Sequence, residues 1–328
     1  MEDVKVSVIC LVYNHEKFLR RCLDGFVNQK VNFTFEVLIH DDASTDSSKD
    51  IIIEYYEKYP NILNPIFEKE NQYSKHISIS NNILLPKAQG KYIAFCEGDD
   101  YWCDDTKLQK QFDYMEEHPE CSMCTHNTII HDLSGKSEDK KINNWSDIHI
   151  LNDKEVFYDY WVHTTSYFIR KEIVKKPEFA LKYWAGDYAL LTLAHYKGQI
   201  ACLPYVMSVY NNNNPNGKIR REMDVNVSSR IRRFEKSKDY LDNYNEYTNK
   251  KYDKIICEVN KKNEFMILIY KFTNRNITKE EYNKLKKQIL MHDYFKKYYN
   301  ELELKQKIIF IIKKSNYLVF KYLKKIKK

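Results

Sequence analysis

Three carboxylates follow a short apolar segment in the first third of the chain. Residues 92–96 are typical of a buried strand, and Glu97, Asp99 and Asp100 come directly after them around a single glycine. Acids at the edge of a core repel one another unless a cation or hydrogen-bond donors lie among them. Hard oxygen ligands on a tight turn suit Mg²⁺ or Mn²⁺ carrying a phosphate-bearing substrate. The alternative is an acidic turn that only caps a helix beginning near Asp104.

The segments around this turn alternate between strand and helix patterns. Strands are expected at 6–12, 35–40, 64–67 and 92–96, and helical spacing occurs at 18–26, 51–56 and 79–87. Such alternation predicts an α/β fold with a mostly parallel sheet flanked by helices, which binds ligands at the carboxyl ends of its strands. The pairs Tyr13-Asn14 and Asp41-Asp42 lie at two such ends. Ser44 or Thr45 is expected to cap the helix that follows the second strand.

The alternating pattern continues to about residue 215. A helix is expected from Leu108 to near Pro119, and further strands are expected at 122–130, 165–169 and 200–210. Residues 132–150 read as a loop, whereas an apolar helical stretch follows Gly186-Asp187. The asparagine-rich run 211–217 is turn-like, and the charged segments after it have helical spacing. We therefore predict a first domain over residues 1–215 and a helical C-terminal region with a basic tail over residues 216–328.

The composition narrows the class of protein. No run approaches the roughly 18–20 apolar residues of a membrane span, and the strand pattern at the very start leads us to expect no signal peptide. The eight scattered cysteines are then expected to be reduced, as in a cytoplasmic protein. Cys121-x-x-Cys124 with His126 lacks the fourth ligand of a structural zinc site. The net charge of +7 arises from nine lysines without an acid in residues 305–328, so we expect no nucleic-acid groove across the fold.

Four motifs together resemble family 2 glycosyltransferases of the GT-A fold. They are VSVICLVYNHE (6–16), VLIHDDASTD (37–46), GKYIAFCEGDDYW (90–102) and AGDYAL (185–190), in the family's order and at similar spacing. The resemblance covers about the first 210 residues. It implies a Rossmann-like sheet and a nucleotide-sugar-dependent, usually inverting enzyme of the type common in bacterial surface-polysaccharide assembly.

The resemblance also implies a donor site. Val12, Tyr13 and Glu16 would line the pocket for the base and ribose. Asp42 matches the acid that accepts a hydrogen bond from the base, and a carboxylate suits a uracil ring N–H because charge-assisted bonds are the stronger ones. This favours a UDP-sugar donor. Asn82 occupies a position that is often polar in the family and would reach the donor.

The metal and the general base follow from the same motifs. Asp100 is expected to coordinate Mn²⁺ or Mg²⁺, with Asp99 on the metal, a metal-bound water or the ribose, and Glu97 orienting the turn. The cation would stabilise the charge that grows on the departing nucleoside diphosphate. Asp187 matches the general base that takes the proton of the acceptor hydroxyl, and direct attack predicts inversion. The alternative role of Asp187 is an ordinary helix N-cap.

Three further side chains are candidates for the sugar or acceptor. His163 resembles a position beside the sugar in relatives, although a lone histidine before a strand is more often structural. Trp102 and Trp184 flank two acidic motifs and would offer flat faces to a sugar, although core packing is their commoner role. Many relatives carry a histidine after the segment that here ends at Tyr210. This chain has Asn211–Asn214 instead, which leaves the third protein ligand of the metal open, and Lys218, Arg220 and Arg221 are candidates to neutralise the diphosphate.

The basic tail and the acceptor complete the expected partners. The lysines of residues 305–328, interleaved with apolar residues, would attract anionic lipid by about 1 kcal/mol each. We therefore expect a cytoplasmic protein on the inner face of the membrane with a saccharide or lipid-linked glycan acceptor; a solvated helix is the alternative for the tail. Two other functions stay open: a non-catalytic sugar-nucleotide-binding or scaffolding subunit, and a nucleotidyltransferase. The second would want a glycine-rich N-terminal loop, which residues 12–16 lack.

Overall fold

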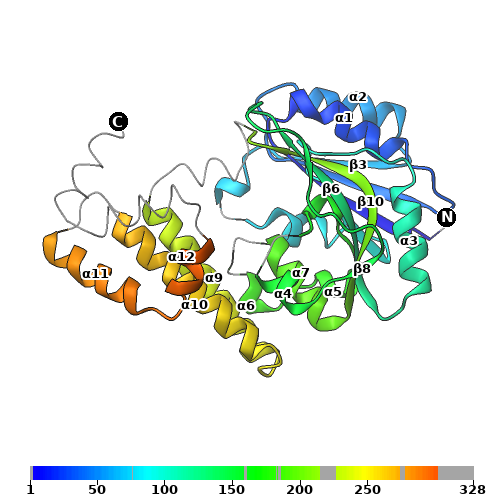
Figure 1. Cartoon of the computed structure of the whole chain (residues 1–328). Helices are drawn as coiled ribbons and strands as arrows, with labels where there is room; N and C mark the ends of the chain where they lie inside the picture. Colours follow the sequence, from blue (N-terminus) through cyan, green and yellow to red (C-terminus); the bar gives the residue numbers. More distant parts are fainter. Residues whose placement is uncertain are drawn as a thin grey trace. The chain divides into compact units, whose positions relative to one another are not determined.

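The computed structural model describes residues 3–75, 77–158, 161–181, 183, 186–214, 227–273 and 278–301 of the chain (Figure 1). The chain separates into two compact units, residues 1–217 and 218–328, and each is described here by itself. The domain boundary predicted near residue 215 lies outside the described residues and stays a prediction.

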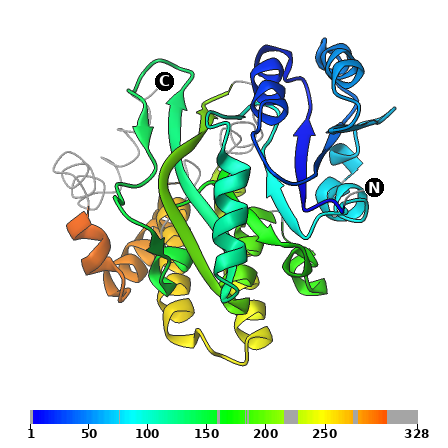
Figure 2. The same ribbon diagram turned by 90° about the vertical axis from the view of Figure 1, so that its right-hand side faces the viewer.

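The first unit is built on a mixed sheet whose strands follow the order β3-β2-β1-β4-β9-β6-β10-β5 (Figure 2). The two remaining short strands, β7 and β8, pair with β6 and β10. The bounds are β1 Val6–Val12, β2 Phe35–Asp41, β3 Leu63–Phe67, β4 Tyr92–Phe95, β5 Tyr101–Trp102, β6 Cys121–Asp132, β7 Lys140–Lys141, β8 His149–Ile150, β9 Phe168–Arg170 and β10 Gln199–Asn212.

The strand directions place several loops at one edge of this sheet. β1 pairs in parallel with β2 and β4, and β6 pairs in parallel with β10. The short strand β9 is antiparallel to both β4 and β6, so β4 and β6 run in the same direction. The carboxyl ends of β1, β2, β4, β6 and β10 therefore lie at the same edge, where ligands of open α/β sheets bind.

Helices cover both faces of the sheet. Apolar side chains of β1 such as Val6, Val8 and Cys10 pack in one core cluster with Leu19 of α1 and Leu108 of α3. Figure 1 shows α4, α5 and α7 on the side of the sheet away from α1 and α2. The bounds are α1 Glu16–Val27, α2 Ser48–Lys58, α3 Lys107–Glu117, α4 Asp153–Phe157, α5 Lys171–Val174, α6 Glu178–Leu181 and α7 Gly186–Lys197.

Four local expectations differ from the structure. The helix expected over 79–87 is a single π-helical turn, η2 (Ser80–Leu84), in a segment where Pro86 cannot continue a helix. The loop expected over 132–150 contains β7 and β8. The strand expected over 165–169 is a 3₁₀ turn, η3 (Thr164–Ser166), followed by β9. The cap expected from Ser44 or Thr45 is wrong, because α2 begins after Ser47 with no side-chain cap.

The second unit is helical throughout its described part, as predicted for the C-terminal region. Its helices are α9 (Val227–Tyr247), α10 (Asp253–Thr273), α11 (Lys279–Met291) and α12 (Phe295–Glu301). Aromatic rings form its core: Tyr244 stacks with Tyr252, and Phe265 packs against Tyr298 with ring centroids 4.8 Å apart. Within the described ranges, no helix combines the length and the apolarity that a membrane span requires.

Candidate active site

The loops that end β1 and β2 are fastened to each other by backbone–side-chain hydrogen bonds. Asn14 donates its N–H to Ser44 Oγ at 2.9 Å, and its own Oδ1 accepts the N–H of Thr45 at 2.8 Å. Asn14 and Ala43 both have positive φ, at 58° and 59°. Left-handed backbone at non-glycine residues is uncommon and gathers at functional sites. The residues expected to cap α2 therefore shape the carboxyl edge of the sheet instead.

Glu16 belongs to the same cross-link. Its Oε2 accepts the N–H of Ser47 at 3.0 Å, and its own N–H donates to Asp46 Oδ2 at 3.0 Å. The predicted donor-pocket residues thus lie together at the end of β1. The side chain of Val12 is 1% exposed and belongs to the core cluster, whereas Tyr13 is half-buried beside it.

Asp42 holds a neighbouring loop. It is 3% exposed, and its two carboxylate oxygens accept the N–H groups of Gln72 at 2.6 Å and Tyr73 at 3.1 Å. Asn71 closes the same contact by donating its Nδ2 to the carbonyl of Asp42 at 3.0 Å. The predicted base-binding acid is therefore fixed in place by residues 71–73. A carboxylate has about four acceptor positions, so these bonds leave room for a further donor.

The acidic turn after β4 is a compact structure. Asp100 is 3% exposed, and its N–H donates to the carbonyl of Glu97 at 3.0 Å. That carbonyl also lies 3.6 Å from the thiol of Cys22 on α1. Burial raises the pKa of Asp100 well above its ordinary value, and the neighbouring Asp99 carboxylate adds to the rise. The side chain of Glu97 is exposed, which agrees with a supporting role for it.

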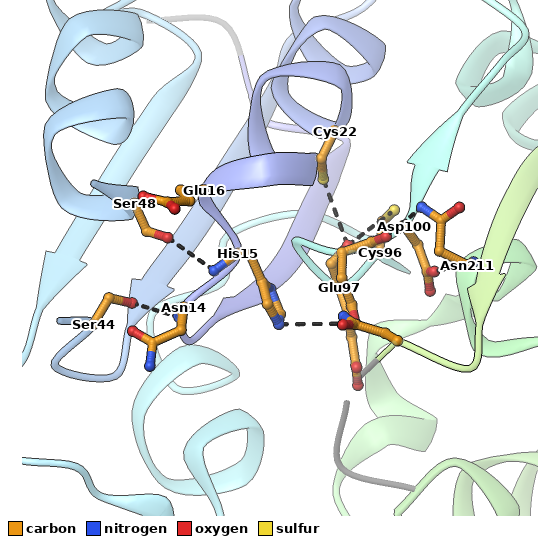
Figure 3. Close-up of polar contacts among 12 residues, drawn as sticks. Asn14, His15, Glu16, Cys22, Ser44, Ser48, Cys96, Glu97, Asp100 and Asn211 are labelled. Carbon is orange, nitrogen blue, oxygen red and sulfur yellow. Dashed lines mark hydrogen bonds and ion pairs between the residues drawn. The ribbon is translucent and has the colours of Figure 1, made fainter. Parts of the chain in front are cut away.

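His15 reaches this turn from the end of β1. Its Nε2 lies 3.8 Å from Asp99 Oδ2, while its N–H donates to Ser48 Oγ at 2.9 Å. Figure 3 shows His15 pointing toward the turn on one side and Asn211 facing it on the other. Gly98 permits this approach, because a Cβ there would lie 2.9 Å from His15 Nδ1. His15 was not among the predicted site residues, although it stands inside the first motif.

The asparagine run after β10 closes the other side of the turn. Asn211 donates its N–H to Asp100 Oδ1 at 2.9 Å and its Nδ2 to the carbonyl of Asp99 at 2.6 Å. Asn214 donates its Nδ2 to Asp99 Oδ2 at 2.9 Å. Amide groups of Asn211 and Asn214 therefore hold both aspartates of the turn. β10 extends two residues beyond its predicted end and delivers Asn211 as part of the strand.

Asp187 stands in the first turn of α7. That helix leads through Gly198 into the amino end of β10, so its own first turn lies toward the carboxyl edge of the sheet. The Asp187 carboxylate accepts a local hydrogen bond from the N–H of Tyr188 at 2.9 Å. Lys176 is close by, since a Cβ on Gly186 would lie 3.1 Å from its Nζ. Burial lowers the pKa of Lys176 to about 8, and the Asp187 charge opposes that shift.

The other predicted contacts are less accessible. His163 is 8% exposed, stacks on Tyr210 with centroids 4.1 Å apart, and caps η3 by accepting the N–H of Thr165. Burial lowers the pKa of His163 to about 3, so its ring is neutral. Trp102 is 3% exposed and packs edge-on against Phe26, as a core residue does. Asn82 is exposed on η2, and Trp184 lies outside the described residues, as do Lys218, Arg220, Arg221 and residues 305–328.

A divalent cation fits the acidic turn. Two adjacent carboxylates, one of them buried, would repel less with a cation between them. Mg²⁺ and similar ions commonly take one or two carboxylates and complete their shell with substrate phosphates and water. Over the described residues, no three His, Cys, Asp or Glu side chains converge as a metal site does. Asp99 and Asp100 are therefore the acidic ligands that this turn offers.

Comparison with other sequences agrees with this geometry. Residues 7–176, more than half of the chain, match the profile described as glycosyl transferase family 2. An uncharacterized protein of Mycobacterium tuberculosis is 34% identical over 208 residues, which is 62% of this chain and 58% of the relative. The minor teichoic acid biosynthesis protein GgaB of Bacillus subtilis is 29% identical over 188 residues, 56% of this chain and 20% of that protein. The chain thus spans less than two thirds of these relatives.

Solved structures show the same fold at low identity. S. aureus TarS 1–349 in complex with UDP-GlcNAc matches with a TM-score of 0.52 and 17% identity, covering 96% of this chain and 83% of that one. The mannosyltransferase PcManGT of Pyrobaculum calidifontis, in complex with GDP-Man and Mn²⁺, matches with a TM-score of 0.50 and 14% identity, covering 91% and 86%. The sheet is that of a GT-A fold, and the chain belongs to glycosyl transferase family 2.

Proposed function

We propose that this chain is an inverting, metal-assisted glycosyltransferase that moves a hexosyl or N-acetylhexosaminyl group from a UDP-sugar to a saccharide or lipid-linked saccharide. The observation that carries the proposal is the acidic turn: a buried Asp100 beside Asp99, placed at the edge where β1, β2 and β4 end. A buried acid pair is costly for folding. A cation bound together with the donor diphosphate would offset that unfavourable free energy.

The donor side rests on two loops. Val12, Tyr13 and Glu16 end β1 and would contact the base and ribose, and Asp42 would accept the ring N–H of the base with a lone pair that Gln72 and Tyr73 leave over. A uracil ring offers that N–H. TarS binds UDP and UDP-GlcNAc, whereas PcManGT binds GDP-Man, so the family fold accommodates both bases.

Bound at Asp99 and Asp100, Mn²⁺ or Mg²⁺ would stabilise the negative charge of the departing nucleoside diphosphate. The chain's own contribution is to hold Asp100 through Asn211 and to fix the turn against α1 through the contact of Cys22 with the Glu97 carbonyl. Asp187 would take the proton of the acceptor hydroxyl as the new bond forms. Among the described residues, the Tyr188 N–H is the hydrogen-bond donor to this carboxylate, and one such bond leaves acceptor positions for that proton.

The acceptor is proposed from the relatives. Teichoic acid and teichuronic acid biosynthesis proteins of Bacillus subtilis match parts of this chain, which supports an acceptor in bacterial surface-polymer assembly. A cytoplasmic enzyme would meet a lipid-linked acceptor at the inner membrane surface, and the lysines of residues 305–328 would favour anionic lipid there. Co-sedimentation with phosphatidylglycerol vesicles tests this, since a chain ending at residue 304 would stay in the supernatant if the tail is the anchor.

The test of the enzyme proposal begins with donor binding. Thermal stabilisation is measured for UDP-, GDP- and dTDP-sugars, each with Mn²⁺ and with chelator. We expect one UDP-sugar with Mn²⁺ to stabilise the protein most, followed by slow hydrolysis of that donor. NMR of the product with a saccharide acceptor then reports the anomeric configuration. No binding of any nucleotide would defeat the proposal, and retention would defeat the direct-attack mechanism.

The Asp187→Asn variant tests the role of Asp187 as general base independently of donor binding. We expect this variant to bind donor normally and to lose transfer by 100-fold or more, the range over which general bases act. Asp50→Asn, an exposed acid on α2, is the matched control. Donor binding by the wild-type protein without any turnover would favour the alternative of a non-catalytic sugar-nucleotide-binding subunit.

A further inference from the structure

Asn214 lies beside the acidic turn that would hold a cation. The described residues bring no third His, Cys, Asp or Glu to Asp99 and Asp100. The amide of Asn214, 5% exposed, instead lies against Asp99, with 2.9 Å between Nδ2 and Oδ2. Asparagine also carries a hard carbonyl oxygen of the kind that Mg²⁺, Ca²⁺ and Mn²⁺ accept.

The spacing agrees with shared coordination. Two oxygens in neighbouring positions of an octahedral ion with bonds of 2.0–2.1 Å lie about 2.9 Å apart. Asn214 Nδ2 and Asp99 Oδ2 have that separation now. A half-turn of the amide about its last side-chain bond exchanges Nδ2 and Oδ1. The same position that donates to the carboxylate without a cation would then present an oxygen to a cation.

The backbone before Asn214 is built to hold it there. Asn213 has φ of 61°, a left-handed conformation that asparagine tolerates, and its Nδ2 donates to Asp132 Oδ1 at 2.8 Å. Asn211 and Asn212 are paired in register with His131 and Asp132 of β6. Asn214 therefore follows a strand end that is tied to β6 and to both acids of the turn.

We propose that Asn214 completes the protein ligands of a divalent cation at Asp99 and Asp100, donating its N–H to Asp99 when the cation is absent and turning its amide oxygen to the cation when it is present. Asn211 is the positioning residue of the pair, because its backbone N–H donates to Asp100 Oδ1 and its amide to the carbonyl of Asp99. The proposal rests on the metal-assisted function above and adds a third protein ligand to the cation site.

The direct test measures cation affinity rather than turnover. Mn²⁺ binding in the presence of UDP is followed by the electron paramagnetic resonance signal of free Mn²⁺, for the wild-type protein and Asn214→Ala. We expect the dissociation constant to rise at least tenfold, the lower end of what is lost when a metal site loses a supporting contact. UDP binding with chelator present should be equal in both proteins, which shows an intact fold. An unchanged Mn²⁺ affinity overturns the proposal.

A second variant separates a ligand from a mere hydrogen-bond donor. Asn214→Cys replaces a hard oxygen by a thiolate, which prefers softer ions. If residue 214 touches the cation, this variant binds Cd²⁺ with a thiolate-to-cadmium charge-transfer absorption larger than that of the wild-type thiols, which include the exposed Cys103 and Cys257. It also exceeds that of the control Asn243→Cys, at an exposed position of α9. Absence of that increase overturns direct ligation. If wild-type protein shows no Mn²⁺-dependent UDP binding, the proposed function fails first, and this inference fails with it.

Discussion

The imidazole of His15 and the carboxylate of Asp99 face each other across the acidic turn, with 3.8 Å between Nε2 and Oδ2. The histidine comes from the end of β1 and the aspartate from the end of β4, two adjacent parallel strands. Their side chains are only 11% and 13% exposed. In the proposed donor complex, the imidazole would donate a hydrogen bond to the charged diphosphate.

Replacing His15 tests this relationship. His15→Ala should weaken UDP-sugar binding about tenfold, because a charge-assisted hydrogen bond contributes about 1.5–3 kcal/mol and each 1.4 kcal/mol is tenfold in affinity. Isothermal titration of both proteins with the UDP-sugar measures the effect. His118→Gln, on the loop after α3, is the control. Equal affinities for His15→Ala and wild type would remove His15 from the donor site.

Asp100→Asn should separate stability from metal binding. Asparagine can still accept the Asn211 N–H, yet it removes the charge whose burial beside Asp99 is unfavourable. We expect the metal-free variant to melt at a higher temperature than the metal-free wild-type protein. Adding Mn²⁺ and UDP should not raise the melting temperature of the variant. Differential scanning fluorimetry with and without Mn²⁺ gives both results. A lower melting temperature without metal would mean that the Asp100 charge itself supports the turn.

Much of this edge of the sheet was predictable because buried strands leave a plain apolar pattern. The sequence indicates β1, β2 and β4 within one or two residues, and with them the placement of Asp42 and Asp100 at strand ends. It also indicates the family from its motifs. Local patterns are enough to place these residues, because the carboxyl ends of parallel strands meet at one edge of the sheet whatever the exact packing of the helices.

Contacts between distant segments were not predictable in the same way. Asn211 and Asp100 are 111 residues apart, and their bond depends on the pairing of β10 with β6, which includes register shifts near Val206. No local pattern fixes such a shift. For Trp102 the sequence left a sugar contact and core packing open; the ring is 3% exposed, and Lys107 Nζ lies 3.9 Å from its centroid.

Gly98→Ala probes how tightly the turn is packed against the end of β1. A Cβ at this position would lie 2.9 Å from both His15 Nδ1 and Val12 Cγ2, and 3.3 Å from the carbonyl of Leu11. Overpacking of this kind costs about 1–3 kcal/mol. Urea unfolding should show that loss, and UDP-sugar affinity should fall as His15 is displaced. Gly135→Asn, where a side chain meets nothing within 4 Å, should leave UDP-sugar affinity unchanged. Its φ of 67° costs asparagine some stability, and less than the overpacking at Gly98, because asparagine tolerates left-handed backbone. If Gly98→Ala unfolds at the same urea concentration as the wild-type protein, the turn accommodates the added methyl group without loss of stability.

The buried Lys107 makes the free energy of unfolding depend on pH. It is fully buried on α3, donates to Gln111 Oε1 at 2.7 Å, and burial lowers its pKa to about 7. In the unfolded chain a lysine holds its proton to about pH 10.4. Between pH 7 and 10 the unfolded state therefore binds a proton that the folded state has lost, so the free energy of unfolding rises with pH. Below pH 7 both states are protonated and the contribution is flat.

Lys107→Met isolates this contribution from the other titrating groups. Urea unfolding is measured at one-unit steps from pH 6 to pH 10 for both proteins. The wild-type free energy of unfolding should rise relative to that of the variant by up to about 1.4 kcal/mol for each pH unit above 7, since one proton is linked to unfolding. The lost bond to Gln111 shifts the variant equally at every pH and drops out of the comparison. Parallel curves would mean that Lys107 stays charged in the folded protein, held by the Trp102 ring.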